Sequence, residues 1–182
     1  MWRYIFIEEK RRKCANLNGD LTTMVEISRN MMMSTCNFTD CFKGFDKVGA
    51  VQCILGAETE DVLARLRVEF TNTTDYMGVD DFEGHLLINP HYLATGDFTD
   101  VYLDVIHELV HVKQFLEGKN SDKKQNYVER PLEIEAYQTA VHEARALGLD
   151  ENRIFDYLDS DLINDQELAK LAQRLDVKIG VF

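Results

Sequence analysis

The sequence predicts an α+β fold, in which a small mixed or antiparallel sheet packs on two long helices and further helices follow. Two short runs typical of strands precede a long apolar helical segment, and three more helical segments come after it. The 182 residues, 45% of them hydrophobic and only 2 of them proline, suffice for a single folded domain. We divide residues 1–182 into an N-terminal extension (1–56), a core (57–148) and a C-terminal helical appendage (149–182).

The elements expected before the long helix are short. They are, in order, a strand at Arg3–Ile7, a helical segment at Leu21–Met33, a helix at 57–66, a strand at 67–72 and a strand at 84–89 closed by Pro90.

Four helices are expected after these strands. The first runs from about Phe98 to Glu117, with Asp97 or Thr99 as its N-cap and Gly118 just after its end. The second begins at Pro131, a residue common in the first turn, and Gly148 ends it. Two shorter helices are expected near 151–159 and 164–174, and the short apolar tail then packs or docks as a strand.

Charge and cysteine content limit the classes of function. A net charge of −12 argues against nucleic-acid binding, which needs a basic face. No secretory signal is evident, and no apolar run approaches the ~20 residues that cross a bilayer, so we expect no membrane association. The irregular spacing of Cys14, Cys36, Cys41 and Cys53 suggests reduced thiols in a cytoplasmic protein, with a second metal site at Cys36 and Cys41 as the alternative.

The long helix contains the motif His107-Glu108-Leu109-Val110-His111. Histidines at i and i+4 lie one above the other on a helix, so both imidazoles can bind one zinc ion. The intervening Glu108 points into the same cleft without having to bind the metal, as a general base would. Asp100 and Asp104 lie on the same third of the helix, and the rest of its surface is almost entirely apolar.

Buried ionisable groups are costly unless they are paired, bind a metal or face water. A zinc ion in a cleft is therefore the favoured explanation of this stripe. The alternative is that His107 and His111 are ordinary semi-buried histidines that hydrogen-bond to Asp104 and Glu108.

A catalytic zinc ion needs a third protein ligand. Glu133, 22 residues after His111, lies on the apolar face of the helix that begins at Pro131, whereas Glu135 points about 200° away and is the less favoured candidate. A Gly and a third His at i+3 and i+6 from His111 would mark another ligand pattern, but Gln114 and Glu117 occupy those places.

These residues resemble the gluzincins, zinc metallopeptidases with HExxH and a glutamate on a following helix. The stretch Glu133-Ile-Glu-Ala136, with the strand and loop before the HExxH helix, resembles the ImmA/IrrE group, and the compact size resembles the minigluzincins. The resemblance covers about residues 65–147. It implies a zincin-like fold with His107, His111 and Glu133 as zinc ligands and Glu108 as catalytic base. Relatives often carry Asp or Asn where this chain has Tyr137, and Thr or Val in place of Asp104.

The resemblance implies a zinc-dependent metallopeptidase whose substrates are peptides or proteins. Glu108 would take a proton from the water activated by zinc and pass it to the leaving amine. Candidates for the oxyanion donor are Tyr127, Tyr137 and His91, and the strand Leu86–Asn89 would offer an edge for an extended peptide. Two alternatives are a zinc-binding regulatory or structural module with little proteolysis, and a latent peptidase whose cleft is blocked.

Overall fold

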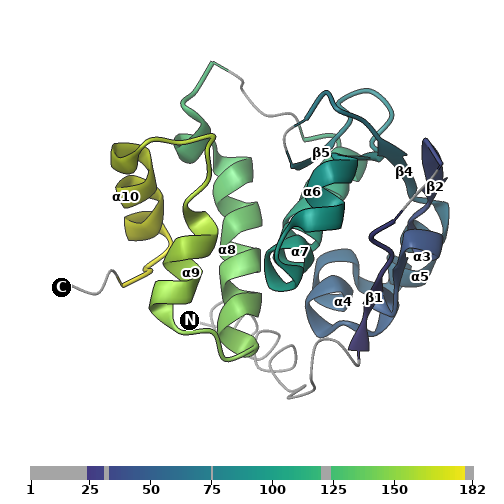
Figure 1. The fold of residues 1–182 in the computed structure, drawn as a ribbon, viewed down its shortest axis with the longest axis horizontal. Coiled ribbons are helices and arrows are strands. Elements are labelled where there is room, and N and C mark those ends of the chain that lie inside the picture. The colour runs from purple at the N-terminus through teal and green to yellow at the C-terminus, as the bar shows by residue number, and fades with distance from the viewer. Residues whose placement is uncertain (1–23, 31–32, 75, 120–123, 179–182) are drawn as a thin grey trace. The chain divides into compact units, whose positions relative to one another are not determined.

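The computed structural model describes residues 24–30, 33–74, 76–119 and 124–178, and it has the predicted α+β character (Figure 1). The chain forms two compact units, one up to Val101 and one from Tyr102 onward. The expected divisions of the single domain near residues 56 and 148 stay predictions. The expected strand at Arg3–Ile7 lies outside the described residues.

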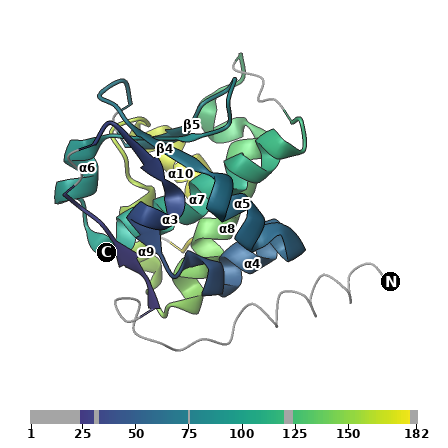
Figure 2. The ribbon, with the colours of Figure 1, turned by 90° about the vertical axis from the view of Figure 1, so that its right-hand side faces the viewer.

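The first unit contains short strands and short helices. In order they are β1 (Glu26–Ile27), β2 (Thr35–Asn37), α3 (Phe38–Cys41), β3 (Phe42–Lys43), the 3-10 turn η1 (Phe45–Lys47), α4 (Gly49–Leu55), the 3-10 turn η2 (Gly56–Glu58), α5 (Thr59–Arg65), β4 (Arg67–Phe70), β5 (Met77–Val79), β6 (Leu86–Ile88) and α6 (Pro90–Thr95). Helices α3 and α4 both lie against α5 (Figure 2). In the same unit, Phe38 of α3, Phe42 of β3 and Phe45 of η1 pack their rings against one another.

A four-stranded sheet organises this unit, with strand order β2-β4-β6-β5. Strands β4 and β6 are parallel, and the other two pairings are antiparallel, so the predicted mixed sheet is confirmed. The proposed use of Leu86–Asn89 as a free edge is wrong, because β6 pairs with β4 on one side and β5 on the other. Its backbone groups are already hydrogen-bonded within the sheet.

The helical segment expected at Leu21–Met33 is also wrong where the structure describes it. Glu26–Ile27 forms a strand paired with Phe42–Lys43, not part of a helix. Val25 and Ile27 are buried while Glu26 is exposed, so this stretch follows the two-residue period of a strand.

Cys36 and Cys41 are joined by a disulfide. Cys36 lies in β2 and Cys41 is the last residue of α3. The irregular spacing of the four cysteines in the sequence does not reveal this pairing. The two cysteines are therefore not reduced thiols, and they cannot supply the thiolates of a second metal site. We expected a cytoplasmic location because we expected reduced cysteines, and the disulfide contradicts that reason.

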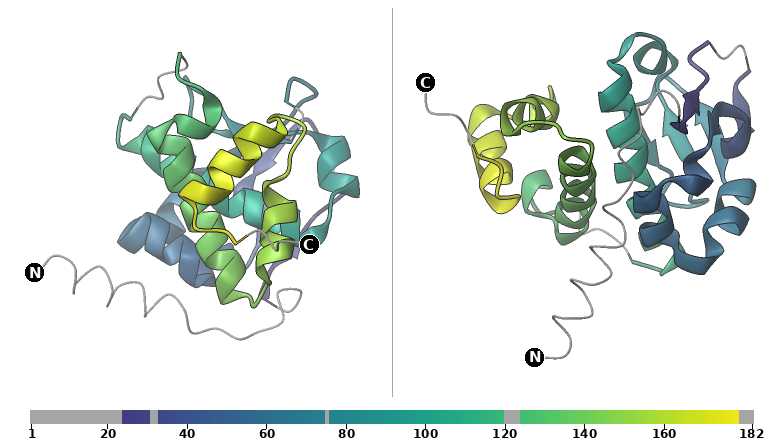
Figure 3. Two further views of the ribbon diagram at one scale, coloured as in Figure 1. Left: turned by 90° about the vertical axis from the view of Figure 1, so that its left-hand side faces the viewer. Right: turned by 90° about the horizontal axis from the view of Figure 1, so that it is seen from below.

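The second unit is helical within the described residues. It contains most of α7 (Phe98–Leu116), the 3-10 turn η3 (Tyr127–Glu129), α8 (Pro131–Ala146), α9 (Glu151–Leu158) and α10 (Asp165–Arg174). Figure 3 shows α9 beside both α8 and α10. No helix in the described parts of the chain is both long and apolar enough to cross a membrane.

The helix ends agree with the sequence signals. The Asp97 carboxylate accepts hydrogen bonds from the backbone amides of Thr99 and Asp100, so Asp97 is the N-cap of α7. Gly118 adopts a φ of 70° after α7, a conformation that favours glycine. Asn164 and Glu167 form a capping box at the start of α10. The features that mark these helix ends therefore come from residues close to the ends in the sequence.

A buried polar pair links α7 to α8. The Tyr102 hydroxyl donates a 2.6 Å hydrogen bond to the Glu143 carboxylate, and both side chains are buried. Burial raises the pKa of Glu143. We expect Tyr102→Phe to lower the free energy of unfolding by about 1–3 kcal/mol, because a buried carboxylate loses its donor. Urea denaturation followed by circular dichroism measures this, and a variant as stable as the wild type would show that the pair contributes nothing.

Candidate metal centre

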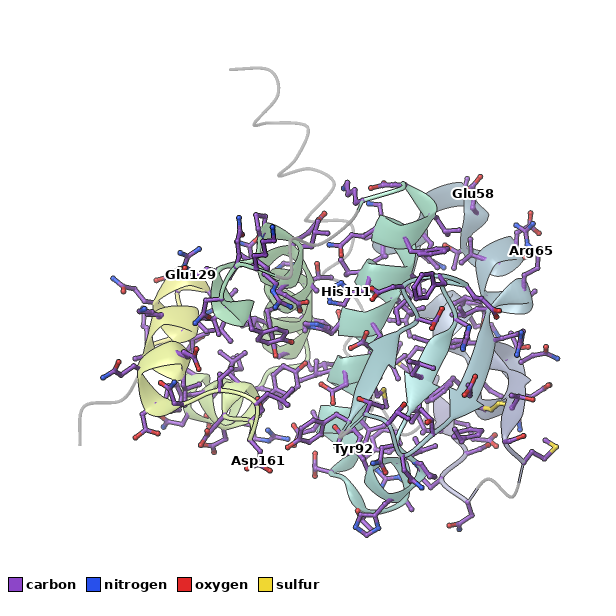
Figure 4. All side chains as sticks on the ribbon, turned by 90° about the horizontal axis from the view of Figure 1, so that it is seen from above. Glu58, Arg65, Tyr92, His111, Glu129 and Asp161 are labelled. Atoms are coloured by element: carbon purple, nitrogen blue, oxygen red, sulfur yellow. A yellow bond between two sulfur atoms is a disulfide. The ribbon has the colours of Figure 1, made fainter. Side chains whose placement is uncertain are left out.

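His107, His111 and Glu133 meet between α7 and α8. The two Nε2 atoms are 3.0 Å apart, and Glu133 Oε2 lies 3.2 Å from His111 Nε2 and 3.5 Å from His107 Nε2. Figure 4 shows His111 on the side of α7 that faces α8. These three are the sole group of at least three possible ligands in the described parts of the chain. The structure therefore brings the three predicted ligands together.

The donor set fits a zinc ion. Ligand atoms arranged tetrahedrally at ~2.0–2.1 Å from zinc lie roughly 3.3–3.4 Å from one another. The three separations in this cluster bracket that value, so an ion needs little movement of the side chains. Two imidazole nitrogens and one carboxylate oxygen are also a usual ligand set of catalytic zinc.

The three side chains of this cluster shift one another's pKa values. Burial lowers the pKa of His111, but the hydrogen bond to Glu133 and the charges of Glu108 and Glu133 outweigh burial and raise it. Burial instead lowers the pKa of His107 to about 4. Although burial alone would raise the pKa of Glu133, its bonds to the two histidines lower it. A metal ion bound here would take the place of the proton on His111.

Glu108 lies beside this cluster and is buried. Burial raises the pKa of its carboxyl group, the charge of His111 lowers it, and the charges of Glu133 and Asp104 raise it, with a net pKa of about 7. A carboxyl group that exchanges its proton near neutral pH is suited to general acid–base work.

Two tyrosine hydroxyls lie next to the cluster. The ring of Tyr137 packs edge-on against His107, with centroids 4.4 Å apart, and the Tyr137 and Tyr127 hydroxyl oxygens are 3.3 Å apart. Burial, together with nearby carboxylates, raises the pKa of both phenols. Both hydroxyls therefore stay protonated at neutral pH and can act as hydrogen-bond donors.

The turn η3 carries Tyr127, and its position depends on α10. Asn126 caps η3 by accepting from the Val128 amide, and its own amide group donates a 2.6 Å hydrogen bond to Glu167. Glu167 is the acid of the α10 capping box. The C-terminal helices thus help to hold a hydroxyl of the site in place, which the sequence did not reveal.

Asp104 lies one turn before His107 on the same helix. Its carboxylate accepts a 3.1 Å hydrogen bond from the Tyr157 hydroxyl of α9. Its charge also raises the pKa of Glu108 and of Tyr137. Asp104 therefore adds negative charge near the cluster and ties α7 to α9.

Comparisons with protein-family models, with curated proteins and with solved structures found no match. The site has to be interpreted from its own geometry.

The two histidines are oriented in different ways. His111 Nδ1 donates a 2.7 Å hydrogen bond to the Gln114 carbonyl oxygen. His107 Nδ1 is buried and has no hydrogen-bond partner among the described residues. The His107 imidazole packs against the ring of Tyr137 instead.

Gln114 belongs to this site but was not predicted as a site residue. It is only 2% exposed and bonds to both α7 and α8. Its place three residues after His111, on the same side of the helix, is the signal that could have identified it.

The remaining sequence candidates lie elsewhere. The Glu135 side chain is 45% exposed and bonds to Gln114 and Lys119, as expected for a solvated acid. His142 is exposed, as predicted. His91 belongs to α6 in the first unit, and its role as an oxyanion donor stays a prediction.

Proposed function

We propose that this chain is a zinc-dependent metallopeptidase with a zincin-like arrangement, in which His107, His111 and Glu133 hold the ion. The observation that carries the proposal is the set of three ligand-atom separations, 3.0, 3.2 and 3.5 Å, on an HExxH helix and its neighbour. A zinc ion bound by such a set supplies Lewis acidity that activates water and polarises a carbonyl group.

Glu108 is the general base of the proposed reaction. Its carboxylate accepts a proton from the attacking water and then delivers that proton to the leaving amine. Its burial beside the cluster supports this role, because a general base has to lie within reach of the attacking water in a site shielded from solvent.

The Tyr127 and Tyr137 hydroxyls are the candidates for stabilising the oxyanion that develops on the peptide carbonyl. A donor in a site shielded from water stabilises such a charge more strongly than it would in solution. The paired hydroxyls stay protonated at neutral pH, which supports this assignment over roles that need a phenolate. Peptides or proteins are the proposed substrates. The carboxylates of Asp104 and Glu108 disfavour acidic side chains close to the scissile bond.

The number of ligands favours catalysis over a structural zinc module. Structural zinc sites are almost always closed by four protein ligands, whereas catalytic sites have three and keep one position open. The group found in the described residues has three members. The proposal does not include a cytoplasmic location. That location was expected from reduced cysteines, and Cys36 and Cys41 form a disulfide.

Metal removal tests the proposal directly. Incubating the full chain with a mixed library of short peptides should yield cleavage products detectable by mass spectrometry. Chelation should abolish cleavage, and about one equivalent of zinc per chain should restore it. Cleavage that survives complete removal of metal, or a chain that binds no zinc, would contradict the proposal.

A further inference from the structure

The hydrogen bonds of the buried Gln114 side chain suggest how two of the zinc ligands are held in the metal-free protein. Gln114 uses both ends of its side-chain amide. Its carbonyl oxygen accepts from His111 Nδ1 at 2.7 Å, and its nitrogen donates to the Leu132 backbone carbonyl at 3.1 Å and to the Glu135 carboxylate at 3.0 Å. We propose that Gln114 is a positioning residue that fixes both His111 and Glu133 for metal binding.

The orientation of the Gln114 amide follows from its partners. The Leu132 carbonyl and the Glu135 carboxylate can only accept hydrogen bonds, so the amide nitrogen must face them. The amide oxygen must then face His111, and Nδ1 of that histidine must be the donor. The Nε2 lone pair of neutral His111 is left directed at the ligand cluster, as metal binding requires.

The same amide also positions the third ligand. The Leu132 carbonyl belongs to the peptide bond whose nitrogen is that of Glu133. By bonding to this peptide group, Gln114 fixes the first turn of α8 against α7 at the point where the Glu133 side chain begins. Gln114 thus acts on two of the three ligands, and it does so from a position that is almost fully shielded from water.

This inference rests on the proposed metal site and adds a residue that holds it. His107 provides a contrast inside the same site, because its Nδ1 has no such partner among the described residues. Hydrogen-bond partners of metal ligands are typically worth 10–100-fold in metal affinity. Because Gln114 holds His111 and Glu133 in place for the metal, removing its hydrogen bonds should lower the affinity for zinc.

Zinc affinity of four variants, measured by competition with a coloured chelator, tests the role. Gln114→Met keeps the size and removes every hydrogen bond, and it should bind zinc about 10–100-fold more weakly. Gln138→Met, an exposed change of the same kind on α8, is the matched control and should bind like the wild type. Gln114→Glu can still accept from His111 Nδ1, but a carboxylate cannot donate to Leu132 and repels Glu135, so this variant should lose part of the affinity. Combining Gln114→Glu with Glu135→Gln restores a donor between the two positions and should recover part of the affinity.

Cobalt(II) in place of zinc gives a second readout that does not depend on activity. Its visible spectrum reports the number of ligands, and Gln114→Met should weaken the four-coordinate absorption while Gln138→Met leaves it unchanged. Wild-type affinity in Gln114→Met, or a double variant no better than Gln114→Glu alone, would overturn the positioning role and leave the metal site standing. A wild-type chain without zinc binding would overturn both.

Discussion

Glu108→Gln should bind zinc as tightly as the wild type and hydrolyse peptides about 10²–10⁴-fold more slowly, the usual contribution of a general base. Glutamine keeps the shape of the side chain but cannot take a proton from water. Glu108 does not belong to the group of ligand atoms, so the metal should remain. Kinetics on a peptide cleaved by the wild type, together with metal analysis of both proteins, measures the two effects separately.

Glu117→Gln is the matched control for this change. Glu117 follows the end of α7, and its exposed carboxylate pairs with Lys119 at 2.7 Å, so the same chemical substitution there removes one negative charge away from the cluster. It should leave both zinc affinity and hydrolysis unchanged. Full activity in Glu108→Gln would remove the glutamate from the mechanism, and loss of zinc from that variant would mean that Glu108 supports the metal site instead.

Much of the site could be predicted because its determinants are local. The spacing of His107 and His111 and the register of Glu133 follow from helix geometry. Asp97 and Gly118 mark the ends of α7 through hydrogen bonds and backbone conformation that a few residues decide. For the long amphipathic helices, the sequence was therefore enough to predict where each helix lies and which residues share the face that carries the ligands.

Other contacts could not be predicted from the sequence, because they join segments that are far apart along the chain. Asn126 and Glu167 are 41 residues apart, and Tyr157 and Asp104 are 53 apart, so only tertiary packing brings them together. The strands of the first unit are two to four residues long, too short for a clear two-residue period. Both the strand at Glu26–Ile27 and the interior position of β6 depend on partners elsewhere in the chain.

Glu133→Gln should weaken zinc binding by more than about 100-fold, beyond the usual effect of changing an outer partner of a ligand. A neutral amide is a poor zinc ligand, and it also removes the charge that balances the histidines. Glu135→Gln should bind zinc like the wild type, because its amide oxygen can still accept from Gln114. The Glu133 side chain is 12% exposed and its carboxylate lies 3.2 Å from His111 Nε2, whereas the Glu135 side chain is 45% exposed.

The two substitutions are chemically identical and only two residues apart on α8, so unequal effects cannot come from the loss of a charge as such. Titrating each variant with zinc under the same conditions decides between the two glutamates. Loss of zinc from Glu135→Gln alone would assign the third ligand to Glu135. Tight binding by both variants would contradict the assignment of Glu133 as the third ligand and leave His107 and His111 as the assigned ligands.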